Sequence, residues 1–355
     1  LYLWHQPVFA FWRHYSLFEP THVQMLMAAF LSFLLAVLTF YFVETPIRSK
    51  HSVLSRKQVF NGSAVMLSAL IAIGLTGHLQ KNFEFKEIYP FDYQPDREPL
   101  RTKSWSILRN IADSSSYRNQ GNHYDNLLWF DPDDHRHNIL IVGNSHSKDL
   151  FNVLFHSKVA NDNFELARFG AQIHELNEGF FESPNYIFSD AIIIVSRFSE
   201  SDLDALQSLA DRIISDGKSL VVVPNIFKFY DTRLRTLVDI MVLQCIRSSS
   251  CDASELFRSI NAAFFKEFEA GLDENPYFNS LSFIRELKEK RPEIIVLDRM
   301  KYVCSKEHRR CYAVDERLNK FFYDYEHHTL EGAKFFATIV DDIGWLAPLV
   351  RSLEP

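Results

Sequence analysis

A serine in the middle of the chain and an aspartate–histidine pair near its end have the residue types of an acyl-transfer or hydrolytic site. Ser145 follows an apolar run over 139–142 and lies in the tetrapeptide Gly-Asn-Ser-His. Asp324 stands three residues before His327, just ahead of a helical pattern. In such a set the serine attacks a carbonyl carbon, the imidazole takes the serine proton, and the carboxylate orients the ring. The spacing therefore predicts Ser145, His327 and Asp324 as catalytic residues.

Each half of this set also has a plainer interpretation. Ser145 alone is an ordinary helix N-cap, whose side chain satisfies a backbone N–H at the start of a helix. The histidine is assigned by the Asp-x-x-His spacing, which selects His327 and leaves His328 as an expected exposed neighbour. His146, directly after the serine, is assigned no step.

The elements that must position these residues are those of an α/β domain with a parallel sheet. After residue 137, apolar β-branched runs alternate with amphipathic helical patterns, which is typical of βαβ units. We expect strands at 138–143, 164–169, 190–196, 218–224 and 292–298. We expect helices at 201–215, 253–271, 278–290 and 332–346. Ser145 then lies at the carboxyl end of the first strand, where open α/β sheets bind ligands.

Composition and charge exclude several classes of function. The 355 residues are 47% hydrophobic and carry a formal net charge of −7, without the basic footprint of a nucleic-acid-binding protein. Cysteines and histidines show no zinc-type spacing. We therefore expect no nucleic-acid partner, no metal ion and no bound cofactor.

Two uncharged segments, 23–43 and 59–79, are long enough to cross the hydrocarbon core of a bilayer. The alternative is a pair of buried core helices, but both segments lack charges and are bounded by polar residues, which favours a membrane. Short basic loops stay in the cytoplasm, and the connector contains four basic residues: Arg48, Lys50, Arg56 and Lys57. The chain beyond about residue 80 is then expected outside, which for a bacterial inner membrane is the periplasm.

The four cysteines agree with an oxidising compartment. Cys245 and Cys251 are near neighbours, and so are Cys304 and Cys311. This spacing is what two local disulfides require. Free buried thiols are the alternative interpretation.

Gly-x-Ser-His early in the chain and Asp-x-x-His late resemble the SGNH hydrolase superfamily, which has a flavodoxin-like parallel sheet. Its oxyanion hole combines the serine N–H, a glycine N–H after the second strand and an asparagine after the third. Gly170, after the expected strand 164–169, corresponds to that glycine. The third strand is followed by Arg197 and not by the asparagine. Either Arg197 or the backbone near it lines the pocket, or two backbone donors suffice. The alternative is that Arg197 is a surface salt-bridge residue. Asn144 replaces the superfamily's usual aspartate.

The segments Leu-Tyr-Leu-Trp-His-Gln-Pro at 1–7 and Phe-Val-Glu-Thr-Pro-Ile-Arg at 42–48 resemble the closing signatures of the acyltransferase-3 family. One branch of that family adds a membrane helix and a periplasmic SGNH domain. The resemblance implies three parts. These are the end of a membrane acyltransferase domain plus the extra helix (1–80), a periplasmic linker (81–137) that packs on the domain, and the SGNH domain (138–355).

Members of this branch O-acetylate surface polysaccharides such as lipopolysaccharide O-antigen. The resemblance therefore implies acetyl-CoA as cytoplasmic acyl donor, a glycan as acceptor, and an acyl-enzyme on Ser145. It also implies a bilayer around the N-terminal helices and earlier membrane helices that precede this chain. An acetylesterase that trims glycans is the alternative, because water can replace the sugar. A catalytically inactive glycan-binding domain is a third possibility.

The basic connector makes the topology testable. A reporter that folds only in the periplasm, fused after Gln80, is expected to be active, because four positive charges hold the connector in the cytoplasm. A reporter that works only in the cytoplasm, fused at the same position, is the control and is expected to be silent. The reverse pattern would overturn both the orientation and the argument for disulfides.

Overall fold

The computed structural model describes residues 2–16, 20–48, 55–79, 93–114, 128–231, 235–248, 251–271 and 274–354. The chain divides into two compact units, and each is described by itself. The smaller unit contains residues 1–92 with two short pieces near 233 and 248, and the larger unit contains the rest. Much of the expected linker, at 81–92 and 115–127, lies outside the described residues, as does Lys50.

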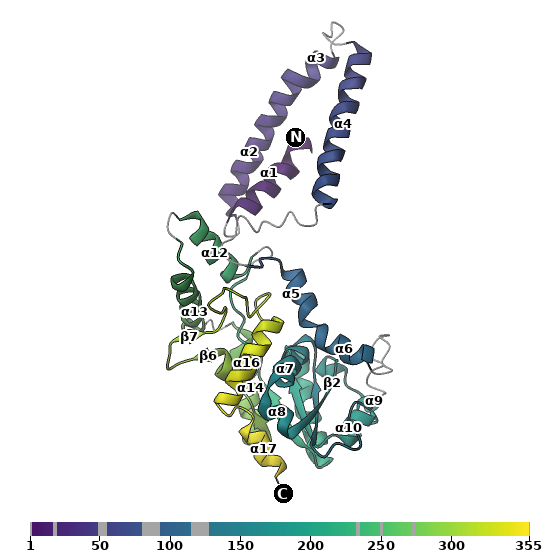
Figure 1. Cartoon of the computed structure of the whole chain (residues 1–355), viewed down its shortest axis with the longest axis vertical. Helices are drawn as coiled ribbons and strands as arrows, with labels where there is room; N and C mark the ends of the chain where they lie inside the picture. Colours follow the sequence, from purple (N-terminus) through teal and green to yellow (C-terminus); the bar gives the residue numbers. More distant parts are fainter. Residues whose placement is uncertain are drawn as a thin grey trace. The chain divides into compact units, whose positions relative to one another are not determined.

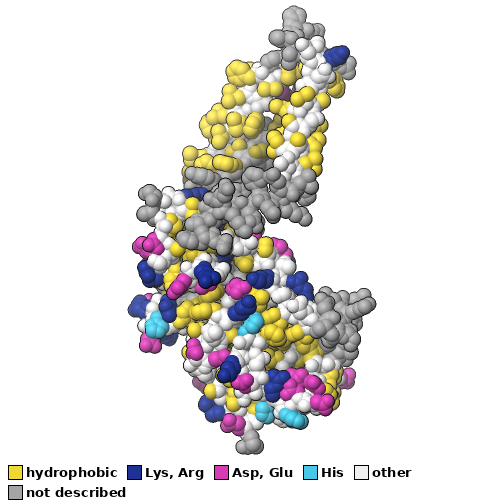
Figure 2. All heavy atoms as spheres, in the orientation of Figure 1, with side chains coloured by type: hydrophobic (Ala, Val, Ile, Leu, Met, Phe, Trp, Pro, Cys, Tyr) yellow, Lys and Arg dark blue, Asp and Glu magenta, His cyan; other side chains and the backbone are white. Residues whose placement is uncertain are grey.

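The smaller unit is helical (Figure 1). Its elements are α1 (Tyr2–Tyr15), α2 (His22–Thr39), the π-helical turn η1 (Phe40–Glu44), α3 (Thr45–Arg48) and α4 (Arg56–Leu79). The stretches His22–Glu44 and Lys57–Thr76 are long and apolar enough to cross a membrane. In the most apolar part of each stretch, the buried share is 11% for the first and 0% for the second. A core helix of a soluble protein would be mostly buried. Figure 2 shows hydrophobic side chains gathered over these helices.

The larger unit is built on a five-stranded sheet in the order β2-β1-β3-β4-β5, in which all neighbouring strands run parallel. The strands are β1 (His137–Val142), β2 (Phe164–Phe169), β3 (Ala191–Val195), β4 (Ser219–Val223) and β5 (Ile295–Val296). This order is that of flavodoxin-like doubly wound folds. The predicted α/β class with a parallel sheet is confirmed. The last strand is shorter than the expected 292–298, because only Val221 and Val222 pair with it at the sheet edge.

Helices cover both faces of this sheet. On one face, Leu140, Ile192 and Leu220 pack against α11 (Glu200–Ser215) and α14 (Pro276–Lys290). Residues between them in the strands point to the opposite face, where α7 (Ser145–His156) contacts β1 and β3 and packs on α16 (Leu330–Asp342). The other elements include η4 (Ile173–Glu175), α8 (Lys158–Asn163), α9 (Glu178–Phe181), α10 (Pro184–Phe188), α12 (Leu237–Arg247), α13 (Ala253–Ala270), α15 (Met300–Val303) and α17 (Ala347–Leu353).

The described end of the expected linker packs on the sheet unit. It forms α5 (Arg97–Ser104) and α6 (Ser106–Ser114). Ser104 is fully buried; its hydroxyl accepts a hydrogen bond from Lys148 Nζ at 3.0 Å, and its carbonyl accepts one from Asn152 Nδ2 at 2.7 Å. Both partners lie on α7, so this segment supports the helix that begins at Ser145.

Two disulfides lie in the larger unit. Cys245, on α12, is bonded to Cys251, and Cys304 is bonded to Cys311. The second bond joins the paired strands β6 (Cys304–Ser305) and β7 (Arg310–Cys311). It therefore closes a hairpin that precedes the loop containing Asp324.

Gly143, between β1 and α7, is expected to tolerate no side chain. Its φ is +148°, and a Cβ there would lie 1.9 Å from the carbonyl oxygen of Val195 on β3. Gly143→Ala should destabilise the protein by about 3 kcal/mol or more, because backbone strain and a steric clash add. Gly217→Ala is the matched control, since its φ is +77° but no atom lies within 4 Å. Thermal melting of the full chain in detergent should show a clearly larger loss for Gly143→Ala, and equal losses would contradict the clash.

Candidate active site

The nucleophile candidate sits on the turn between β1 and α7. Gly143 makes the turn, and Asn144 caps α7 by accepting a hydrogen bond from the His146 N–H at 3.2 Å. Ser145 is the first residue of this helix of 12 residues. The helix N-terminus presents unpaired N–H groups and the positive end of its dipole beside the serine. The turn therefore places a hydroxyl next to a site that favours negative charge.

The structure brings Ser145, His327 and Asp324 together across 182 residues of sequence. Ser145 Oγ lies 2.8 Å from His327 Nε2. His327 Nδ1 lies 2.9 and 3.1 Å from the two carboxylate oxygens of Asp324. Asp324 Oδ1 also accepts backbone N–H groups of Glu326 at 3.0 Å and His327 at 2.8 Å. This is the geometry of a serine held by a base, which is held by a carboxylate.

Two rings stack on the His327 imidazole. His146 stacks on it with centroids 4.8 Å apart and planes 13° apart. Tyr323 stacks on it with centroids 5.4 Å apart and planes 5° apart. Stacking of this kind fixes the ring plane, so His146 positions the candidate base.

His328 is not the exposed neighbour that the sequence led us to expect. It is fully buried and contacts the rings of Tyr302, Phe322 and Phe336. Consecutive residues of an extended segment point to opposite sides, so His327 faces the serine while His328 enters the aromatic core. The prediction of exposure was wrong because the residues that bury His328 come from other elements.

The charges around His327 set its proton affinity. Burial by itself lowers the pKa of His327, but the hydrogen bond to Asp324 and the charges of Asp149 and Asp324 outweigh it, so the pKa lies above its usual value. Burial by itself raises the pKa of Asp324, but its bonds to His327 and two backbone N–H groups bring that pKa below its usual value. Asp324 is therefore a carboxylate at neutral pH and stabilises the imidazolium form.

Gly170 follows β2, beside the nucleophile turn. The Gly143 N–H donates to Phe169 O at 3.1 Å, and the Ala171 N–H donates to Gly143 O at 3.2 Å. A Cβ on Gly170 would lie 2.8 Å from the guanidinium of Arg168. That guanidinium donates to the carbonyl of Asn144 at 3.2 Å and to Ser147 Oγ at 2.8 Å. The absence of a side chain at Gly170 thus makes room for an arginine that supports the turn.

Arg197 connects the nucleophile turn to the loop that carries the base. Its backbone N–H donates to Asn144 Oδ1 at 3.2 Å. Its Nη1 lies 3.1 Å from the Tyr325 hydroxyl and 3.1 Å from Glu326 Oε1. The side chain of Arg197 is 43% exposed, whereas that of Glu326 is 5% exposed. The arginine is therefore paired with a buried carboxylate at the site and is not an ordinary surface salt-bridge residue.

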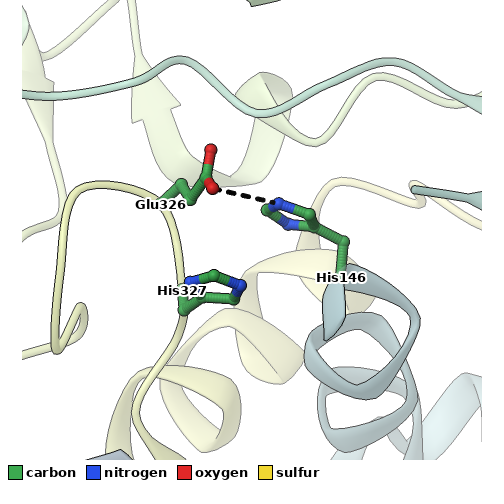
Figure 3. Close-up of side chains that lie close together, drawn as sticks. All are labelled: His146, Glu326 and His327. Carbon is green, nitrogen blue, oxygen red and sulfur yellow. Dashed lines mark ion pairs between the residues drawn. The ribbon is translucent and has the colours of Figure 1, made fainter. Parts of the chain in front are cut away.

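Glu326 is a residue of the site that the sequence analysis missed. Its Oε1 also lies 3.6 Å from His146 Nε2 (Figure 3). Burial holds the pKa of His146 well below its usual value, so this contact joins a carboxylate to a neutral imidazole. Burial also raises the pKa of Glu326, although Arg197 opposes that shift. Its position inside Asp-x-Glu-His was the available signal, but a loop glutamate is usually exposed.

His146, Glu326 and His327 offer ligand atoms within 4.8 Å of one another, which by distance alone would suit a metal ion. The surrounding charges oppose one. Arg299 Nη1 lies 3.3 Å from His146 Nδ1, and Arg197 pairs with Glu326. Both ring nitrogens of His327 are already engaged, by Ser145 and Asp324. The cluster therefore fits a group that positions the base better than a metal centre.

Comparison with protein families adds to this geometry. A family model described as an SGNH domain fused to AT3 domains matches residues 115–342. The chain belongs to this family. The resemblance inferred from the motifs of the SGNH domain is thereby confirmed. No curated protein sequence matches the chain.

Several solved structures are weakly similar to this chain. The periplasmic domain of a lipopolysaccharide acetyltransferase from Salmonella ser. Paratyphi A is 12% identical, with a TM-score of 0.40, over 68% of this chain and 97% of that one. A GDSL-like lipase from Bacteroides thetaiotaomicron is 10% identical, with a TM-score of 0.33, over 67% and 97%. An acylhydrolase from Bacteroides fragilis is 11% identical, with a TM-score of 0.34, over 69% and 98%.

The raised pKa of His327 predicts a pH dependence. Because the base must be neutral, kcat/KM for a short acyl ester should rise with pH through a midpoint above about 6.5, the value of a free imidazole. In Asp324→Asn the rate should fall and the midpoint should move to lower pH, because the carboxylate that stabilises the imidazolium is gone. Asp204→Asn, an exposed change on α11, is the control. An unchanged midpoint in Asp324→Asn would show that Asp324 does not act on the base.

Proposed function

We propose that the chain is the C-terminal part of a membrane-anchored O-acyltransferase that moves an acetyl group onto glycan hydroxyls through Ser145. The observation that carries this proposal is the 2.8 Å contact between Ser145 Oγ and His327 Nε2, continued to Asp324. The family supports it, because this kind of SGNH domain is fused to AT3 domains. The acceptor is a bacterial surface polysaccharide such as lipopolysaccharide O-antigen.

The proposed reaction has two halves. In the first, Ser145 Oγ attacks the acyl carbonyl and its proton passes to His327 Nε2, while Asp324 stabilises the imidazolium. The oxyanion forms beside the α7 N-terminus, with Gly170 and Arg197 as the expected further donors. The leaving group then takes the proton from His327. In the second half, a sugar hydroxyl gives its proton to His327 and attacks the acyl-serine. The bond to Ser145 Oγ then breaks, His327 returns the proton to Oγ, and the acetylated sugar is released.

The proposed setting is a bacterial inner membrane. Helices that include His22–Glu44 and Lys57–Thr76 would anchor the chain in the bilayer. The SGNH domain would lie in the periplasm, and acetyl-CoA would deliver the acyl group on the cytoplasmic side of a membrane domain completed by preceding helices. No cofactor needs to stay bound, because the acyl group is carried by Ser145.

Variants of the site test the nucleophile. Ser145→Ala and His327→Ala are each expected to lower turnover by at least about 10³-fold, and the double variant should be little worse, because the residues act as one unit. The full chain in detergent, given an activated acetyl ester, should gain an acetyl group on Ser145 that peptide mass mapping locates. Ser208→Ala, on α11 and exposed, is the matched serine control.

The fate of the acetyl-enzyme separates transferase from esterase. Added acceptor glycan should discharge the adduct faster than water alone and should itself become acetylated. Equal discharge with and without glycan would favour the acetylesterase. Acetylation of glycan by Ser145→Ala at the parental rate would reject the mechanism.

A further inference from the structure

A cavity of about 600 Å³ opens in the larger unit at the end of α16 that is remote from the candidate base. Ile339 and Ile343 line it, whereas α16 begins at Leu330, directly after the loop of His327. A helix rises 1.5 Å per residue, so about 14 Å separates Leu330 from Ile339 along the axis. None of Ser145, Asp324 and His327 lines the cavity. Its volume is within the range of small-molecule sites.

Aromatic side chains form part of the cavity wall. Phe268 from α13 and Tyr277 from α14 lie with ring centroids 5.9 Å apart, and Tyr312 follows β7. The Cys304–Cys311 disulfide braces the hairpin that completes the wall. Aromatic rings offer flat apolar faces on which the C–H face of a sugar ring can pack.

The charged groups of the cavity favour an anion. Arg285, Lys301 and Lys306 line it, are exposed, and make no ion pair with any described residue. The cavity also contains the carboxylates of Asp298 and Glu307. Asp298 is already engaged, because it accepts hydrogen bonds from the Tyr277 hydroxyl at 2.8 Å and the Met300 N–H at 2.9 Å. Three cations therefore share the lining with two carboxylates, one of them already hydrogen-bonded, and the lining keeps a net positive charge.

We propose that this cavity binds an acidic saccharide unit, one that carries a carboxylate. A neutral sugar would leave the cations unpaired, and a small anion would leave the aromatic wall uncovered. The choice of a saccharide rests on the proposed glycan acceptor, whereas the preference for an anion rests on the lining alone. The cavity is separate from Ser145 and would be a second binding site for the polysaccharide.

The cavity is connected to the candidate active site through the segment 298–300. Asp298 and Met300 line it, and between them the fully buried Arg299 points inward to His146, at 3.3 Å. The cavity and the candidate site therefore share one segment of a single unit. A polysaccharide held by one acidic residue in the cavity keeps its other sugars at high effective concentration around Ser145. The acceptor class that fits is thus an acidic polysaccharide.

Ligand-observed saturation-transfer NMR on the full chain in detergent tests this site. Glucuronate is the probe, with glucose and acetate at equal concentration as neutral and simple-anion controls. We expect glucuronate to bind at least about tenfold more tightly than either control. Arg285→Glu combined with Lys301→Glu should weaken glucuronate binding at least about tenfold, because attraction becomes repulsion. Lys290→Glu reverses a single charge on α14 outside the cavity, as each of the two substitutions does inside it, and should leave binding unchanged.

Three outcomes would contradict the proposed acidic-saccharide site. Equal binding of glucuronate and acetate would indicate a simple anion site, and equal binding of glucuronate and glucose would remove the role of charge; either result overturns the proposal. So does an equal loss in Lys290→Glu, which would show general attraction to a basic surface. Lys306→Glu is a second variant if the double variant shows a lowered melting temperature. Ser145→Ala should keep full glucuronate binding, so failure of the acyl-transfer mechanism and failure of this site are read separately.

Discussion

The hydrogen bond between Asp324 and His327 is the interaction on which the candidate site depends. It joins residues three apart in one loop, so the loop itself sets its geometry, and two backbone N–H groups hold the carboxylate in place. The bond orients the ring so that Nε2 faces Ser145 and favours the protonated form that a base must reach during reaction. Without this hydrogen bond, the His327 ring would lose the contact that turns Nε2 toward Ser145 Oγ, 2.8 Å away.

Buried charge around this bond is arranged to support it. Glu326 contacts Arg197 on one side and His146 on the other, and His146 stacks on His327. Arg299 lies behind His146 and donates to the carbonyl of Pro224 at 3.3 Å. Leaving the buried Glu326 or Arg299 without its partners would be costly, because each is removed from water. Side chains from several strand ends and loops thereby help to position the His327 imidazole.

The parallel sheet supplies the frame for these groups. Asn144, Gly170 and Arg197 each follow the end of one of three neighbouring strands, β1, β2 and β3, and the carboxyl ends of parallel strands meet at one edge. Close approach of β1 to β3 is possible because Gly143 has no side chain. Behind the turn, Lys148 and Asn152 hold Ser104 and so fix the N-terminal extension to the same helix.

The sequence by itself determined the fold class, the apolar helices and the Asp324–His327 pair, because each rests on a local pattern, and the resemblance of two distant motifs supplied Ser145 as the partner of that pair. β-branched runs predict buried strands, uncharged segments predict spans, and Asp-x-x-His needs only one loop. Only the tertiary structure decided the burial of His328, the contact of Glu326 with Arg197 and His146, and the room that Gly170 makes for Arg168. It also shortened the last strand at the sheet edge. These features depend on which distant elements pack together, and no local pattern contains that information.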